Sequence, residues 1–128
     1  MQLTHVALQV RDLERSIAFY ERVCGLRVVH DRTEDFRVVW VGTGEQPPRF
    51  VIVLLAKEYE LNVAPPLQHV GLSVASRQDV DTFCARAERH GAPIVWHATE
   101  GGPVVGYFAA ASDPDGNLIE VSHGQRIG

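Results

Sequence analysis

Two histidines and one glutamate are the residues of this chain best suited to hold a metal ion. His5 is the second residue of the segment 4–10 (THVALQV), and His69 is the second residue of its near copy at 68–74 (QHVGLSV). Glu120 lies among aliphatic residues, where a carboxylate is costly unless it is paired or bound to a cation. Two imidazoles and one carboxylate suit a divalent metal and leave coordination positions open. The sequence therefore predicts a metal site at His5, His69 and Glu120.

Both histidines begin a segment in which apolar residues alternate with small or polar ones. In each copy the residues at even steps from the histidine are small or polar, and the residues between them are aliphatic. A period of two is typical of a half-buried strand with two differently packed faces. An imidazole on the small, polar face points into a cavity more readily than into a core, and two histidines at matching positions strengthen that interpretation.

The repeat extends past the histidines and predicts two βαβββ modules. Each first strand leads into residues with helical spacing, with Asp12 and Ser76 as N-caps and a glycine beyond the end. Further strands are expected at residues 26–30, 36–41, 50–56, 94–97, 105–111 and 118–122. The predicted fold class is α+β in one domain, residues 1–128, with module one at 1–62 and module two at 67–124.

Composition limits the function classes. The chain has 128 residues, a formal net charge of −4 and no basic run, which argues against a nucleic-acid partner. No apolar stretch approaches the roughly 20 residues that span a bilayer, and no secretory signal is recognisable at the start, so we expect no membrane partner and a cytoplasmic protein.

Four segments together resemble the vicinal oxygen chelate superfamily, which includes glyoxalase I, bleomycin-resistance proteins and extradiol dioxygenases. They are His5 with its strand, residues 12–26, residues 69–74 and residues 113–120 (DPDGNLIE). The resemblance implies that the modules form a cup-shaped mixed sheet, with the metal inside and small-molecule substrates bound through two neighbouring oxygens. It also implies a homodimer in which one subunit supplies His5 and the other His69 and Glu120.

The sequence departs from the four-ligand site of glyoxalase I. The missing ligand would lie on the last strand of module one, where Val53 takes its place. Glu58 and Glu60 follow closely, so a different register could supply a carboxylate there. A simple alignment gives a three-ligand site for Fe, Mn, Zn or Ni.

Two other subfamilies also match incompletely. The tyrosine that extradiol dioxygenases place three residues before the Asp-Pro pair is Ala110 here, with Tyr107 offset by three. The threonine of the fosfomycin-resistance enzymes, two residues after the first histidine, is Ala7.

We therefore expect a metal-dependent, glyoxalase-related enzyme with lyase/isomerase or dioxygenase chemistry. Glu120 is a predicted catalytic residue, and a general acid or base is also needed, for which His97, Tyr107 and Tyr59 are available. The alternative is a metal-free ligand-binding protein of the bleomycin-resistance kind.

Overall fold

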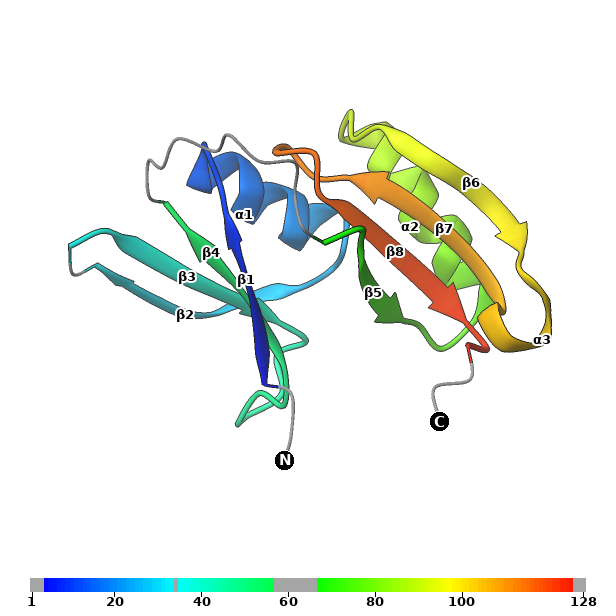
Figure 1. The fold of residues 1–128 in the computed structure, drawn as a ribbon, viewed down its shortest axis with the longest axis horizontal. Coiled ribbons are helices and arrows are strands. Elements are labelled where there is room, and N and C mark those ends of the chain that lie inside the picture. The colour runs from blue at the N-terminus through cyan, green and yellow to red at the C-terminus, as the bar shows by residue number, and fades with distance from the viewer. Residues whose placement is uncertain (1–3, 34, 57–66, 126–128) are drawn as a thin grey trace. The chain divides into compact units, whose positions relative to one another are not determined.

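The computed structural model describes residues 4–33, 35–56 and 67–125, and it contains two βαβββ modules in chain order (Figure 1). Contacts divide the chain into two compact units, Met1–Asn62 (unit 1) and Val63–Gly128 (unit 2). Each unit contains one four-stranded mixed sheet. The predicted α+β class is confirmed, and the predicted order of elements is confirmed apart from one additional short helix in unit 2.

Unit 1 places its first strand beside its last. Its elements are β1 (His5–Gln9), α1 (Leu13–Arg22), β2 (Arg27–Thr33), β3 (Arg37–Gly42) and β4 (Val51–Leu55). The sheet order is β1-β4-β3-β2, with β1 parallel to β4 and the other pairs antiparallel. The first and last strands of the module therefore lie side by side at one edge of the sheet.

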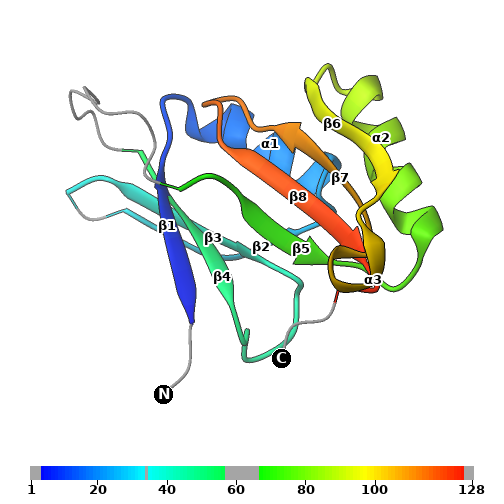
Figure 2. The same cartoon turned by 45° about the vertical axis from the view of Figure 1, so that its right-hand side comes forward.

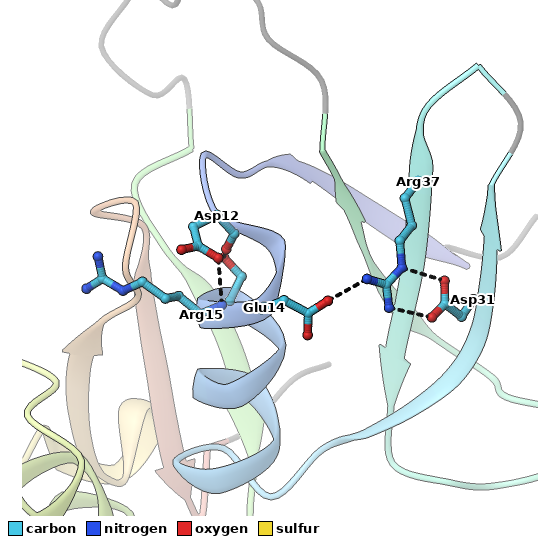
Figure 3. Close-up of polar contacts among 6 residues, drawn as sticks. Asp12, Glu14, Arg15, Asp31 and Arg37 are labelled. Carbon is cyan, nitrogen blue, oxygen red and sulfur yellow. Dashed lines mark hydrogen bonds and ion pairs between the residues drawn. The ribbon is translucent and has the colours of Figure 1, made fainter.

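The sequence of α1 explains where this helix begins and which side it buries. The Asp12 carboxylate accepts a hydrogen bond from the backbone N–H of Arg15 at 3.0 Å, which caps the first turn (Figure 3). Leu13, Ile17 and Tyr20 are buried on one side of the helix, which packs against β2, β3 and β4. The opposite face of the sheet is left for a pocket.

Arg37 ties α1 to the sheet on the helix side. Its Nη1 donates to Glu14 Oε1 at 2.5 Å, and its Nε and Nη2 donate to the two oxygens of Asp31 at 3.0 and 2.7 Å (Figure 3). The hydrogen-bonded guanidinium holds the pKa of Asp31 below its usual value. This bidentate contact holds the charged groups of Asp31 and Arg37 on the helix side of the sheet.

Unit 2 repeats the arrangement. Its elements are β5 (Val70–Ser73), α2 (Arg77–Arg89), β6 (Ile94–Glu100), α3 (Gly102–Val105), β7 (Tyr107–Ser112) and β8 (Leu118–His123), in the sheet order β5-β8-β7-β6. Figures 1 and 2 show α2 along one face of this sheet, where it packs against β6, β7 and β8. Ser76 and Asp79 cap α2 reciprocally, with bonds of 3.2 and 2.9 Å between the side chain of each and the backbone N–H of the other.

The short helix α3 was not predicted. It lies between β6 and β7, so the strand expected at residues 105–111 begins at Tyr107. The turn depends on Gly106, which has a φ of 78° and sits where an added Cβ would lie 2.2 Å from the backbone oxygen of His123. None of the described helices is long and apolar enough to cross a membrane.

Candidate functional site

Unit 2 brings His69 and Glu120 together. His69 precedes β5, Glu120 lies in β8, and the parallel register pairs Gly71 with Glu120. His69 Nε2 and Glu120 Oε2 are 3.7 Å apart. Glu120 is only 5% exposed, and its buried Oε1 has no hydrogen-bond partner among the described residues. A buried carboxylate with an unsatisfied oxygen is costly, so this position calls for a bound cation or donor.

The orientation of His69 indicates which ligand would satisfy this pair. Its Nδ1 contacts Oε1 of Gln68, an acceptor, and this partner favours the tautomer with the proton on Nδ1 and a lone pair on Nε2. Nε2 and Glu120 Oε2 are then two acceptors facing each other. Ligands bound at about 2.1 Å to one ion lie about 3.0 to 3.4 Å apart in octahedral or tetrahedral geometry, close to the observed separation. The pair therefore fits two ligands of a divalent ion.

Small neighbours keep the Glu120 carboxylate open to a pocket. Gly71 on β5 and Ala110 on β7 are the cross-strand partners of Glu120. The pocket has a volume of about 550 Å³ and is lined by Gln68, His69, Trp96, His97, Thr99, Val105, Phe108 and Glu120. Trp96 contacts the His69 ring edge-on, with centroids 5.6 Å apart, and so helps to hold the imidazole.

His97 reaches the pocket because β6 is bulged. Trp96 pairs with Ala110 and Thr99 with Phe108, so three steps on β6 match two on β7. The extra residue lets Trp96, His97 and Thr99 all line the same pocket. The structure thus places His97 in the wall of the same pocket as His69 and Glu120, and its role as acid or base stays a prediction.

Tyr107 lies on the other face of the sheet, which corrects its expected place beside the metal ligands. Its hydroxyl donates to Asp81 Oδ1 of α2 at 2.8 Å, and the Arg77 guanidinium lies 4.0 Å from the centre of its ring. The hydrogen bond to Asp81 raises the pKa of Tyr107. Alternation along β7 turns Phe108, the next residue, into the pocket instead. Tyr59, the third candidate, lies outside the described residues.

Unit 1 holds His5 in the wall of a second pocket, with a volume of about 400 Å³.

The strand register of the two units shows which residue of unit 1 is equivalent to Glu120 of unit 2. Val6 pairs with Ile52 as Val70 pairs with Ile119, and Ala7 pairs with Val53 as Gly71 pairs with Glu120. Val53 therefore occupies the equivalent position, 8% exposed in the wall of the pocket. Glu58 and Glu60 lie outside the described residues.

Sequence reasoning missed the polar residue that precedes each histidine. Thr4 Oγ1 lies 3.1 Å from Nδ1 of His5, as Gln68 Oε1 contacts Nδ1 of His69. A polar side chain immediately before the histidine in both copies was the available signal. These contacts orient both imidazoles through Nδ1 and leave Nε2 for a ligand.

The predicted three-residue site is only partly assembled within one unit. His69 and Glu120 meet in unit 2, whereas His5 belongs to unit 1. Across residues 4–33, 35–56 and 67–125, no three or more His, Cys, Asp or Glu side chains form a cluster that could hold a metal. Convergence of all three residues on one ion stays a prediction.

Val53→Glu tests the equivalence with Glu120. We expect the added carboxylate, on the pocket face beside His5, to tighten zinc or nickel binding by about tenfold or more, measured by competition with a chromogenic chelator. Ile52→Glu is the matched control, because Ile52 is 2% exposed and alternates to the other face of β4. It should lower the thermal unfolding temperature sharply. A folded Val53→Glu protein with unchanged metal affinity would contradict the assignment.

Comparison with known proteins identifies relatives over almost the full chain. Residues 2–121 match the family described as the Glyoxalase/Bleomycin resistance protein/Dioxygenase superfamily. An uncharacterized protein of Pseudomonas aeruginosa is 40% identical over 128 residues, covering 98% of this chain and 91% of that protein. A lactoylglutathione lyase of Salmonella typhimurium is 32% identical over 140 residues, covering 100% and 96%. The solved structure of Leishmania major glyoxalase I, 25% identical, matches with a TM-score of 0.78 over 97% of this chain and 87% of that chain.

Proposed function

The chain belongs to the Glyoxalase/Bleomycin resistance protein/Dioxygenase superfamily, and from this premise we propose that it is a metal-dependent enzyme acting on a small molecule with two adjacent oxygen atoms. The observation that carries the proposal is the buried Glu120 carboxylate, with one unsatisfied oxygen and the other 3.7 Å from Nε2 of His69. A protein that only traps apolar ligands gains nothing from this costly arrangement.

In this proposal His69, Glu120 and His5 hold one divalent ion, either Fe, Mn, Zn or Ni. When bound, such an ion would supply Lewis-acid stabilisation to negative charge developing on a chelating substrate. Gln68 orients His69 through Nδ1, and Trp96 packs against the same ring. Glu120 and His97 are the proposed catalytic residues, with His97 accepting or donating a proton because it lines the pocket beside the ligand pair.

We favour lyase or isomerase chemistry over ring-cleaving dioxygenase chemistry. The relative from Salmonella typhimurium is a lactoylglutathione lyase. The dioxygenase tyrosine is absent at Ala110, and Tyr107 is hydrogen-bonded to Asp81 on the helix side of the sheet. Four-ligand relatives have a further metal ligand at the position of Val53, and a valine side chain can neither bind a metal nor transfer a proton. In this proposal, proton transfer therefore depends on Glu120 and His97.

The second candidate is a metal-free ligand-binding protein. It is supported by the unit 1 pocket, where Val53 replaces a carboxylate and most lining residues are apolar.

We further propose a cytoplasmic homodimer, in which one chain supplies His5 and its partner supplies His69 and Glu120. Each four-stranded sheet ends in two edge strands, and such edges are normally paired or covered.

Metal analysis separates the two candidates. Protein purified without chelator should contain close to one equivalent of a divalent metal per chain, measured by inductively coupled plasma mass spectrometry. Removing the metal with a chelator should lower the unfolding temperature, and adding it back should restore that temperature, because the ion binds only the folded state. Protein without metal, whose unfolding temperature is unchanged by Mn²⁺, Zn²⁺ or Ni²⁺, would support the ligand-binding protein instead.

A further inference from the structure

The Trp96 indole reaches His69 from the opposite edge of the unit 2 sheet. In the order β5-β8-β7-β6, two strands separate β6, which carries Trp96, from β5, which His69 precedes. The two rings nevertheless meet, with centroids 5.6 Å apart. Trp96 pairs with Ala110 on β7, and the methyl group of Ala110 leaves room for the indole to extend over that strand. The equivalent residue of unit 1 is Trp40, beside Val53, where an indole would fill this room.

Phe108 packs against the Trp96 indole from β7. The two rings meet edge-to-face, with centroids 6.2 Å apart and planes 78° apart. Aromatic pairs favour this arrangement at centroid separations of about 4.5 to 7 Å. His69, Trp96 and Phe108 therefore form a row of three rings, here called the ring row, in the wall of the pocket that Glu120 also lines. A ring held by its neighbours has fewer rotamers available to it.

The α3 turn supports the Phe108 end of the ring row. A Cβ atom placed on Gly101 would lie 2.7 Å from Val105 Cγ1 and 2.9 Å from Phe108 Cε1, so these two side chains share the space beside Gly101. Two backbone hydrogen bonds close the turn, from Gly101 N–H to the oxygen of Gly106 at 2.7 Å and from Gly106 N–H to the oxygen of Gly102 at 2.8 Å. The turn therefore holds Val105 beside Phe108.

Helix α2 anchors both ends of the α3 turn. Glu100 directly precedes the turn and Tyr107 directly follows it. The Arg77 guanidinium forms an ion pair with Glu100 and lies 4.0 Å from the centre of the Tyr107 ring, and the Tyr107 hydroxyl donates to Asp81. One exposed ion pair contributes little by itself. Here, however, one guanidinium contacts both residues that flank the turn, which keeps the turn in one place.

We propose that Phe108 is a positioning residue for the metal ligand His69. Phe108 fixes the Trp96 indole, the indole fixes the imidazole, and Val105 of the α3 turn holds Phe108 in place. This inference rests on the proposed function, because His69 is a proposed metal ligand. A ligand that is already oriented loses less conformational freedom when an ion binds, so the ring row raises metal affinity.

Removal of the Phe108 ring tests the proposal without any substrate. We expect the metal-free wild-type protein to show nuclear Overhauser effects between ring protons of His69 and Trp96, and Phe108→Ala to lose them. Manganese affinity, measured by chelator competition, should fall about three- to tenfold in Phe108→Ala, the range expected for one aromatic pair. Phe108→Tyr keeps the ring and should retain both properties. Phe108→Leu replaces Phe108→Ala if the latter does not fold.

Variants of the α3 turn provide matched controls. Gly101 has a φ of −95°, which alanine adopts, so the methyl group of Gly101→Ala acts through its contacts with Val105 and Phe108. Gly101→Ala and Val105→Ala should both weaken manganese binding. Val104→Ala should leave it unchanged, because Val104 is 64% exposed and does not line the pocket.

The outcomes separate this inference from the proposed function. If the wild-type protein binds manganese and folded Phe108→Ala or Phe108→Leu binds it equally tightly, the positioning role is overturned and the metal site stands. If the wild-type protein binds no manganese, the metal site is overturned, and loss or retention of the Overhauser effects in the variant decides whether Phe108 orients His69. Absence of these effects from the wild-type protein would overturn the ring row.

Discussion

Glu120→Ala is expected to abolish stoichiometric metal binding and to lower metal affinity by at least about 100-fold. Loss of a group that only orients a ligand costs about 10- to 100-fold, and Glu120 is proposed as a ligand itself. The measurements are metal content after purification and chelator competition. At a metal concentration 100 times the wild-type Kd, the wild-type protein should gain about 2.7 kcal/mol of stability, and the variant should gain about 0.4 kcal/mol or less.

The metal-free state supplies a second readout for the same residue. In that state Glu120 is a buried carboxylate with an unsatisfied oxygen. Glu120→Gln keeps its shape and removes its charge, so the unfolding free energy of the metal-free protein should stay equal or rise by about 1 kcal/mol. Glu21→Ala, an exposed change in α1, is the control for loss of a carboxylate elsewhere. Stoichiometric metal in Glu120→Ala would show that Glu120 is not a ligand.

Mixing two inactive variants is expected to restore metal binding. His5→Ala lacks the proposed ligand of unit 1, and Glu120→Ala lacks one of unit 2. In a homodimer with shared sites, a mixed dimer has one site with both changes and one site with neither. Equal mixing with free exchange gives half mixed dimers, so about a quarter of all sites should be intact. Metal content and activity should recover to about that fraction of wild type.

Subunit exchange must be shown in the same sample. Mass spectrometry of differently labelled variants can establish the fraction of mixed dimers. His69→Ala mixed with Glu120→Ala is the matched control, because both residues belong to unit 2 and no combination restores an intact site. Recovery in this control, or no recovery with His5→Ala after complete exchange, would contradict sites shared between subunits.

Sequence alone was sufficient for the helices and strands other than α3, and for the strand segments that carry the candidate ligands. Alternation with period two is a local property, so it indicated that His5 and His69 lie on the small, polar face of their segments. The resemblance to four-ligand relatives put Val53 at the position of their further ligand, and Val53 lines the unit 1 pocket. Capping is local as well, and Asp12 and Ser76 begin α1 and α2 as predicted. The repeat and the aliphatic neighbours of Glu120 also predicted that Glu120 and His69 belong to one site.

Only the tertiary structure decided which side chains lie next to the candidate site residues, on neighbouring strands and around the pocket. The bulge in β6 that brings His97 into the pocket adds one residue to a strand and interrupts the alternation, so a periodic pattern does not reveal it. Tyr107 was misplaced because its face of β7 follows from the pairing of Ala110 with Glu120, which puts Phe108 on the pocket face and Tyr107 on the face that contacts Asp81 of α2. The contrast between Ala110 beside Glu120 and Trp40 beside Val53 depends on cross-strand register, which joins residues far apart in the chain and is set by packing of the whole sheet.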